Sequence, residues 1–337
     1  MNQNSEDWLS CHLFYTGNLD TFLTHQVKPF VDKVINQKQA GQFFFIRYWE
    51  RGPHLRLRFK GEKEILENIV KPDLEKFFQD FFEKNPSHRE ASGENNSQHD
   101  DAQLLPNNSI QFISYEPELE RYGGKEGVPI SEKHFESSSK AVLSNLDENR
   151  DWDYDKGMGV AIQMHLSFAN AIGMNLEEAK HFYSGIFLAW VYLAYDWNNL
   201  SKEEHLKKQE IVISAFEDQF EKQKSVLVQY HEAIWEALEG KEEFEEPWLN
   251  KWIQDIALTA KEINAAEENN QLVFPHDDMI TNTWGDIPAE KRRKWYIYGS
   301  YVHMTNNRLG ILNRDEAYLG YLIKRSLEAM SEESIKA

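Results

Sequence analysis

The sequence is short of cysteine, of long apolar runs and of positive charge. Its 337 residues include one cysteine, Cys11. A single cysteine excludes an internal disulfide and a cysteine-rich zinc site, and it agrees with a reducing compartment. The N-terminal sequence MNQNSEDW lacks the basic and apolar segments of a secretory signal, and no apolar run approaches the length of a membrane span. These absences lead us to expect a soluble, cytoplasmic protein with no membrane span.

Positive charge is scarce and unevenly placed. The chain has 37 Lys and Arg against 56 Asp and Glu, a formal net charge of -19. Broad binding to nucleic acid or to an anionic membrane needs many basic residues, so we expect neither. Residues 1–60 nevertheless carry a balance of +3, and the rest of the chain carries -22. Four arginines within this first segment form a small basic island: Arg47, Arg51, Arg56 and Arg58.

Aromatic residues are abundant, and their spacing predicts a folded protein of the α+β class. The 10 Trp, 14 Tyr and 20 Phe exclude a disordered chain. We expect an N-terminal antiparallel sheet with helices over residues 1–130, and a largely helical half over 131–337. Strands are predicted at 8–15, 42–49, 54–59 and 110–118, and helices at 19–36 and 62–84. In the second half a helix is predicted from Ser131, with others at 156–172, 176–197, 201–238, 249–268, 288–311 and 315–330. The polar stretch 86–109 is interpreted as a surface loop or insertion.

The sharpest local feature is the alternating segment HLRLRF, residues 54–59. Alternation directs His54, Arg56 and Arg58 to one face of a strand, and the turn residues before it predict a β-hairpin with residues 42–49. Arg47 lies on the partner strand. Several guanidinium groups on one face would form a cradle for a small carboxylate, a phosphate or a developing oxyanion. A solvated charged face with acidic partners is the alternative, since such faces are common on antiparallel sheets.

Two further segments carry candidate residues. In YEPELERYGG, Arg121 precedes a glycine pair that allows unusual backbone conformations, so this loop could present N–H groups to an anion. An ordinary loop with a surface Arg–Glu pair is the alternative. In YVHMTNNRLG, His303 and Asn307 lie four residues apart and share one face of an expected helix. Histidine is the usual general base near neutral pH, although a lone helical histidine is more often structural. His165, among apolar residues, is interpreted as a packed histidine.

Motifs for other chemistries are absent from the sequence. It contains no P-loop, no GxGxxG on a βα unit, no HExxH and no GxSxG. The twelve histidines do not have the spacing of metal ligands. We therefore expect no cofactor and no metal.

Taken together, FFFIRYWERGPHLRLRFKG, YEPELERYGG and YVHMTNNRLGI resemble, in the same order, the C-terminal SpaB_C-type domain of class I lanthipeptide dehydratases. The same domain occurs free-standing in thiopeptide biosynthesis. The resemblance runs over nearly the whole chain and implies a single domain, 1–337, with a longer connection at 86–109 than is usual. In the full dehydratases one region glutamylates Ser and Thr of a precursor peptide from glutamyl-tRNA. The SpaB_C domain then eliminates glutamate to give dehydroalanine or dehydrobutyrine.

The resemblance also implies site residues. The elimination-site positions of the family correspond to four catalytic residues here: Arg56, Arg58, Arg121 and His303. His303 would act as acid and base, and the three arginines would bind the glutamyl group and the oxyanion. Neighbouring residues expected to bind substrate are Arg47, His54, Asn307 and Arg308.

The resemblance implies a free-standing lyase that acts on a glutamylated precursor peptide. Such a lyase would need a separate glutamyl-tRNA-dependent glutamylating protein and would bind no nucleic acid directly. One alternative is a thiopeptide-type pyridine synthase, which joins two dehydroalanines by a formal [4+2] cyclisation. A second is a non-catalytic protein that binds precursor peptide or scaffolds its partner. The full set of arginines with His303 favours elimination, because a site that binds glutamate has a use for several arginines.

Overall fold

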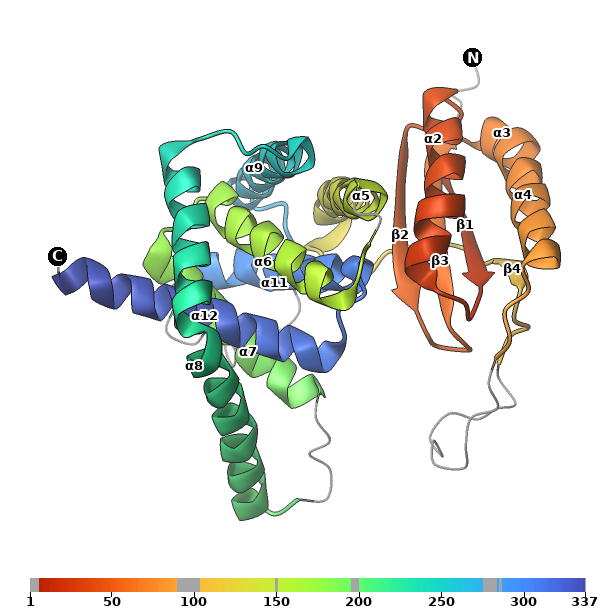
Figure 1. Ribbon diagram of the computed structural model, residues 1–337. Helices are drawn as coiled ribbons and strands as arrows, with labels where there is room; N and C mark the ends of the chain where they lie inside the picture. Colours follow the sequence, from red (N-terminus) through yellow and green to blue (C-terminus); the bar gives the residue numbers. More distant parts are fainter. Residues whose placement is uncertain are drawn as a thin grey trace. The chain divides into compact units, whose positions relative to one another are not determined.

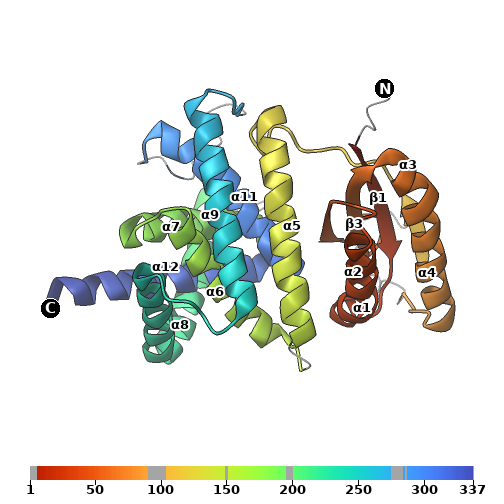
Figure 2. The ribbon, with the colours of Figure 1, turned by 90° about the horizontal axis from the view of Figure 1, so that it is seen from above.

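The computed structural model describes residues 6–89, 104–148, 151–194, 200–274, 284 and 287–336. They form two compact units, drawn in Figures 1 and 2. Unit 1 comprises Met1–Pro117 and Phe135–Trp152, and unit 2 comprises Glu118–His134 and Asp153–Ala337. The predicted α+β class is confirmed. The division between units falls at residue 117, before the predicted boundary at 130, and helix α5 (Gly124–Glu148) contributes to both.

Unit 1 is built on a four-stranded antiparallel sheet with the strand order β2-β3-β1-β4. The strands are β1 (Glu6–Phe14), β2 (Gln42–Tyr48), β3 (His54–Glu62) and β4 (Ser109–Phe112). One helical crossover joins β1 to β2 and another joins β3 to β4, which makes a split βαβ arrangement of the ferredoxin-like kind. The predicted hairpin of β2 and β3 is confirmed, with Phe45 opposite Leu57.

The two crossover helices of unit 1 have a common design. The first consists of α1 (Leu19–Phe22), a π-helical turn (Leu23–Val27) and α2 (Lys28–Asn36). The second consists of α3 (Lys63–Ile65), a π-helical turn (Leu66–Val70) and α4 (Lys71–Lys84). Each π turn ends just before a Lys-Pro pair, Pro29 or Pro72. Because proline has no N–H and its ring crowds the carbonyl four residues earlier, a wider turn accommodates it.

These helices cover one face of the sheet (Figure 1). From α2, Phe30 packs against Phe59 of β3 and Phe78 of α4, with ring centroids 6.0 and 5.5 Å apart. Leu55, Leu57 and Phe59 have no exposed surface. The apolar half of the predicted alternation therefore forms the core of unit 1, and the arginine half lies on the other face of the sheet.

The connection between β4 and α5 differs from the prediction. The strand predicted at 110–118 ends at Phe112, and α5 begins at Gly124 instead of near Ser131. Gly123 and Gly124 have φ angles of 81° and 82°, which redirect the chain directly into the helix. Pro129 lies inside α5 and removes one backbone hydrogen bond, so it had suggested a later start.

The ends of the polar stretch 86–109 are held together by side-chain hydrogen bonds. The Asn107 side chain donates to Ser87 O and to Thr16 Oγ1, at 2.9 and 3.0 Å. Ser87 N–H donates to Asn108 Oδ1 at 2.9 Å. Residues 90–103 of the predicted insertion lie outside the described residues. Its described ends are fixed to the loop that follows β1.

Unit 2 is helical, as predicted. Besides the first part of α5, it contains α6 (Tyr154–Ala171), α7 (Leu176–Ala194), α8 (Lys202–Gly240), α9 (Pro247–Glu268), α11 (Ala289–Leu309) and α12 (Asn313–Lys336). The C-terminal α12 packs along α7 and also contacts α8. Trp284 donates its Nε1–H to Phe182 O, and it approaches α7 so closely that a Cβ at Gly185 would overlap its indole ring. Glycine is required there by packing.

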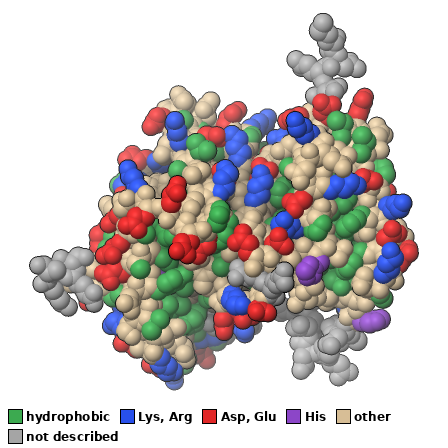
Figure 3. Space-filling view, turned by 45° about the horizontal axis from the view of Figure 1, so that its top comes forward, with side chains coloured by type: hydrophobic (Ala, Val, Ile, Leu, Met, Phe, Trp, Pro, Cys, Tyr) green, Lys and Arg blue, Asp and Glu red, His purple; other side chains and the backbone are tan. Residues whose placement is uncertain are grey.

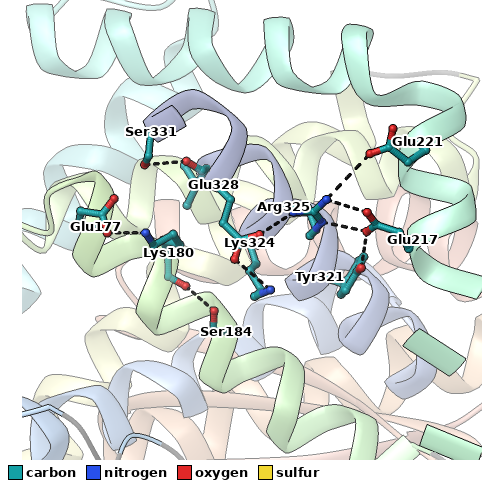
Figure 4. Close-up of polar contacts among 11 residues, drawn as sticks. Glu177, Lys180, Ser184, Glu217, Glu221, Tyr321, Lys324, Arg325, Glu328 and Ser331 are labelled. Atoms are coloured by element: carbon teal, nitrogen blue, oxygen red, sulfur yellow. Dashed lines mark hydrogen bonds and ion pairs between the residues drawn. The ribbon is translucent and has the colours of Figure 1, made fainter. Parts of the chain in front are cut away.

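An ion-pair network links α12 to α8 (Figure 4). Arg325 binds both carboxylate oxygens of Glu217, with N–O distances of 2.7 and 2.9 Å. Tyr321 donates to the same carboxylate, and Arg325 also binds Glu328 at 2.8 Å. Hydrogen bonds from Arg325 lower the pKa of Glu217. A bidentate pair between neighbouring helices fixes their register.

The surface and helix composition agree with the charge of the sequence. On the face shown in Figure 3, acidic side chains are interspersed with Lys, Arg and hydrophobic side chains. Across the described ranges, none of the helices combines the length and apolar character needed to cross a membrane.

Candidate active site

The arginine face of unit 1 is the sheet surface that carries Arg56 and Arg58. Antiparallel pairing of β1 with β3 sets His12 opposite Arg56 and Ser10 opposite Arg58. His54 lies on the same face, two residues before Arg56, and is 1% exposed. The predicted grouping of His54, Arg56 and Arg58 on one face is therefore confirmed.

Aromatic rings surround Arg58. Its guanidinium carbon lies 4.3 Å from the centroid of the Tyr115 ring and 5.2 Å from that of Phe44. Its Nε–H points to Ser10 Oγ at 3.4 Å. Only 7% of Arg58 is exposed. Burial against aromatic faces strengthens the field of a guanidinium, because cation–π contacts are stronger where water is excluded.

Arg56 is held by one ring and one imidazole. Its guanidinium carbon lies 3.4 Å from the centroid of the Tyr48 ring. Its Nε–H donates to His54 Nε2 at 3.3 Å. Tyr48 pairs with His54 across the hairpin, so the three side chains form one cluster on the arginine face.

The two histidines of this face are neutral near pH 7. Burial, with the charge of Arg56 as a further cause, lowers the pKa of His12 to about 3 and that of His54 to about 4. Their rings stack with centroids 4.9 Å apart. The positive charge of the face therefore comes from the arginines, while the histidines serve as neutral packing and hydrogen-bonding groups.

Arg47 does not belong to the arginine face, and grouping it there was wrong. Arg47 pairs with Leu55 in the hairpin, so it points to the helix-covered side of the sheet. There it forms an ion pair with Asp20 of α1, with an N–O distance of 2.5 Å. Phe43, Phe45 and Arg47 alternate with Phe44, and the run of apolar residues in FFFIRY concealed which set faces the helices.

In unit 2, the predicted base His303 is paired with a buried carboxylate. His303 Nδ1 lies 2.9 Å from Glu316 Oε1, and its ring packs on Trp190 with centroids 4.5 Å apart. The side chain of Glu316 is 1% exposed. Burial raises the pKa of Glu316, and the charge and hydrogen bond of His303 oppose that rise. A carboxylate accepts only, so Nδ1 carries the hydrogen and the neutral ring keeps Nε2 as its proton acceptor.

Two more side chains continue this network into the core. Asn306 Nδ2 donates to Glu316 Oε2 at 3.1 Å, and Asn306 Oδ1 lies 2.7 Å from His165 Nε2. Burial lowers the pKa of His165 to about 4, so its neutral ring donates Nε2–H to the amide oxygen. The chain His165–Asn306–Glu316–His303 thus fixes the tautomer of His303. His165 is buried, as predicted, and is also a member of this network.

Arg121 lies along the same helix as His303. Its Nε–H donates to Ser300 Oγ at 3.1 Å, and Ser300 precedes His303 by three residues on α11. Arg121 also pairs with Glu118 at 3.3 Å, which is the alternative that the sequence left open. The charge of Arg121 is among the causes that lower the pKa of Glu316. A cation and a histidine–carboxylate pair therefore share one part of unit 2.

Asn307 and Arg308 have different environments. Asn307 is half-buried, one turn after His303. Arg308 has no exposed surface, and its Nη1–H donates to Met304 O at 2.9 Å. Its charge contributes to lowering the pKa of the buried His134. The burial of Arg308 favours a role in the core of unit 2, and the substrate-binding roles of both residues stay predictions.

The predicted residues thus fall into two groups. His54, Arg56 and Arg58 lie together in unit 1, and Arg121, His303 and Asn307 lie in unit 2. That both groups act on one substrate stays a prediction. Sequence patterns did not indicate Glu316, Tyr48 or Tyr115, because no fixed spacing links them to the residues they contact.

Unit 2 also contains an open cavity of about 940 Å³ beside the Arg121 loop. Leu119, Lys125, Val273 and Arg293 contribute to its lining, and the volume would hold several peptide residues. Within the described parts of the chain, no group of three or more His, Cys, Asp or Glu side chains is arranged to bind a metal ion.

Comparison with known proteins gives consistent matches. The family described as lantibiotic biosynthesis dehydratase C-term matches residues 8–327. The subtilin biosynthesis protein SpaB of Bacillus subtilis is 28% identical over 180 residues, 52% of this chain and 15% of SpaB. The nisin biosynthesis protein NisB of Lactococcus lactis is 26% identical over 155 residues, 44% of this chain and 13% of NisB. The matches thus span only a small part of these curated relatives.

Solved structures share the fold at low identity. The pyridine synthase TbtD from thiomuracin biosynthesis is 19% identical with a TM-score of 0.71, over 95% of this chain and 97% of TbtD. TsrL is 14% identical with a TM-score of 0.67, over 97% of this chain and 96% of TsrL. The tRNA-dependent lantibiotic dehydratase MibB from Microbispora is 18% identical with a TM-score of 0.59, over 99% of this chain and 29% of MibB.

The family match covers almost the whole chain and includes the arginine hairpin, the Arg121 loop and the His303 helix. The chain therefore belongs to the lantibiotic biosynthesis dehydratase C-terminal family.

Proposed function

We propose that this protein is a lyase that eliminates glutamate from glutamylated Ser or Thr of a ribosomal precursor peptide. The observation that carries the proposal is the His303–Glu316 pair, 2.9 Å apart, with Arg121 hydrogen-bonded one turn away on α11. β-Elimination needs a base with a fixed tautomer and a nearby cation, and these residues supply both.

In the proposed reaction, Nε2 of His303 takes the α-proton of the glutamylated residue. The electron pair of the broken C–H bond forms the Cα–Cβ double bond, and the Cβ–O bond breaks. Glutamate leaves as a carboxylate, and dehydroalanine or dehydrobutyrine remains. Arg121 stabilises the enolate oxygen that develops during proton removal. Arg56 and Arg58 bind the carboxylate of the departing glutamyl group.

This function requires two partners. The substrate is a precursor peptide with a leader and a glutamylated core. A separate protein that uses glutamyl-tRNA would attach the glutamate. MibB supports this requirement, because it shares the fold over part of its length and is a tRNA-dependent lantibiotic dehydratase.

The proposal is tested with the purified protein and a synthetic peptide that carries one O-glutamyl serine. We expect mass spectrometry to show loss of the glutamyl group and formation of dehydroalanine. His303→Asn removes the proton acceptor and is expected to slow this reaction by about 10²- to 10⁴-fold. His181→Asn, at an exposed histidine of α7, is the matched control. Elimination at the full rate by His303→Asn would contradict the assignment.

A second candidate function is the [4+2] pyridine synthase. The likeness to TbtD over 97% of that chain supports it, since TbtD has a similar extent and the same fold. A dehydrated precursor peptide distinguishes the two, because a synthase would form a macrocycle and release the leader. Binding of the peptide with no change of its mass would support a non-catalytic binding or scaffold protein instead.

A further inference from the structure

The clearest unexplained feature of the arginine face is the way in which Arg56 is held. We infer that Tyr48 and His54 are positioning residues that orient the Arg56 guanidinium toward a carboxylate ligand without neutralising its charge. The identity of that ligand, a glutamyl carboxylate, rests on the proposed function. The orientation of Arg56 rests on contacts within unit 1 alone.

The Tyr48 ring fixes the plane of the guanidinium. Tyr48 and Arg56 are diagonal neighbours across the hairpin, because Tyr48 pairs with His54 and Arg56 follows two residues later. Diagonal pairs lie within reach of long and aromatic side chains. The distance of 3.4 Å from the guanidinium carbon to the ring centroid is that of direct stacking. Stacking restricts the tilt of the guanidinium and leaves its N–H groups directed along its plane.

His54 fixes the rotation of the same group. His54 Nδ1 lies 2.8 Å from Gly52 O, which can only accept, so Nδ1 carries the hydrogen. The unprotonated Nε2 then accepts the Nε–H of Arg56 at 3.3 Å. Burial keeps the ring neutral by lowering its pKa to about 4, so the acceptor persists at neutral pH. One guanidinium N–H is used in this bond, and the remaining donors are available to a ligand.

The holder contains no negative charge. Among the described residues, no carboxylate lies within ion-pair distance of Arg56, and its contacts are with Tyr48 and His54. Arg47 of the same hairpin provides the contrast, because Asp20 neutralises it on the opposite face. An arginine held by neutral groups keeps its charge for a ligand, whereas an ion-paired arginine has to exchange partners.

This arrangement changes the role of His54. The ring is 1% exposed and both of its nitrogens have partners, Gly52 O and the Arg56 Nε–H. It therefore acts through Arg56 and makes no contact of its own with substrate. The sequence had suggested that His54 binds substrate directly, because alternation placed it in a row with the arginines.

The first experiment measures the holder itself by the NMR signal of the Arg56 Nε–H group, assigned by its loss in Arg56→Lys. A group that lies over an aromatic ring has an upfield shift. We expect Tyr48→Phe to keep that shift and Tyr48→Leu to abolish it. His54→Gln, which can still accept, should keep slow exchange of the Nε–H, and His54→Leu should not. An unchanged Arg56 signal in both leucine variants would overturn the inference.

The second experiment measures the consequence for ligand binding. With the O-glutamyl peptide, Tyr48→Leu is expected to raise KM by about tenfold while kcat changes little, and Tyr48→Phe to restore the wild-type KM. If the protein does not eliminate glutamate, dissociation constants for the peptide and for free L-glutamate replace KM. The Arg56 signal is independent of elimination, so failure of the proposed function and failure of this inference give different results. Equal affinity of Tyr48→Leu and wild type for every ligand that binds would contradict the role of Tyr48.

Discussion

His303 depends on a residue that lies in another helix. Glu316 accepts from His303 Nδ1 at 2.9 Å and from Asn306 at 3.1 Å, so it selects the tautomer in which Nε2 is the acceptor. Glutamine at this position offers an N–H to His303 Nδ1, which favours the opposite tautomer. The proton acceptor would then be lost although the shape of the site is kept.

We therefore expect Glu316→Gln to lower kcat for glutamate elimination by about 10²- to 10⁴-fold. Stability should change little, because a buried carboxylate of raised pKa is replaced by a neutral group of the same size. The measurement is steady-state kinetics together with the ¹⁵N shifts of the His303 ring. Glu328→Gln, in the same helix, is the control. Wild-type kinetics in Glu316→Gln would remove Glu316 from the mechanism.

A second residue-scale prediction concerns His231 of α8, which is fully buried. Neither ring nitrogen has a hydrogen-bond partner among the described residues, and burial lowers the pKa of His231 to about 3. In the unfolded chain its pKa is near 6.5, so folding favours the neutral ring. The resulting stability is present above about pH 6.5 and is lost as the pH falls toward 3.

His231→Leu removes both the unsatisfied nitrogens and this pH dependence. We expect it to raise the free energy of unfolding at pH 7 by about 1–2 kcal/mol, and to raise it further at pH 4.5. Chemical denaturation at the two pH values checks this. The exposed His181→Leu should change neither value appreciably. A leucine variant that loses as much stability as wild type between pH 7 and pH 4.5 would refute the prediction.

At the scale of elements, the sheet of unit 1 uses its two faces differently. Arg47 and Asp20 tie β2 to α1 on the helix-covered face, and Arg56 and Arg58 occupy the other. Arg47→Gln is therefore expected to reduce stability by about 1–2 kcal/mol and to leave KM for the glutamylated peptide unchanged. The half-exposed Asp20 limits the size of the effect.

A double-mutant cycle tests that placement. Because Arg47 and Asp20 act through each other, Asp20→Asn should destabilise by a similar amount, and the double variant by less than the sum of the two. Urea unfolding gives the stabilities, and peptide kinetics gives KM. A rise of KM in Arg47→Gln without loss of stability would instead place Arg47 at the substrate.

At the scale of the whole molecule, the net charge of -19 sets the choice of partners. Counterion release from a nucleic acid needs clustered Lys and Arg, and the visible face mixes both signs of charge (Figure 3). We expect no binding of glutamyl-tRNA to this chain in an electrophoretic shift assay at physiological salt. Binding that weakens steeply with added salt would contradict this, and it would mean that the chain itself handles tRNA.

The sequence by itself determined the elements whose pattern is local. Alternation in residues 54–59 fixed the hairpin and the common face of Arg56 and Arg58, because side chains along a strand alternate with a period of two. Helical periodicity similarly located α6 to α12 within a few residues. The start of α5 was misplaced, because the glycine pair and Pro129 are read as a break when their three-dimensional setting is unknown.

Only the tertiary structure decided the contacts between elements. Four consecutive apolar residues, 43–46, hide the phase of β2, so the face of Arg47 depended on its register with β3. Glu316 reaches His303 because the chain turns at Gly310, between α11 and α12. Tyr48 reaches Arg56 across the hairpin in the same way. The charges of the site are therefore written in the sequence, whereas the tautomer of its base and the orientation of its arginine arise from packing.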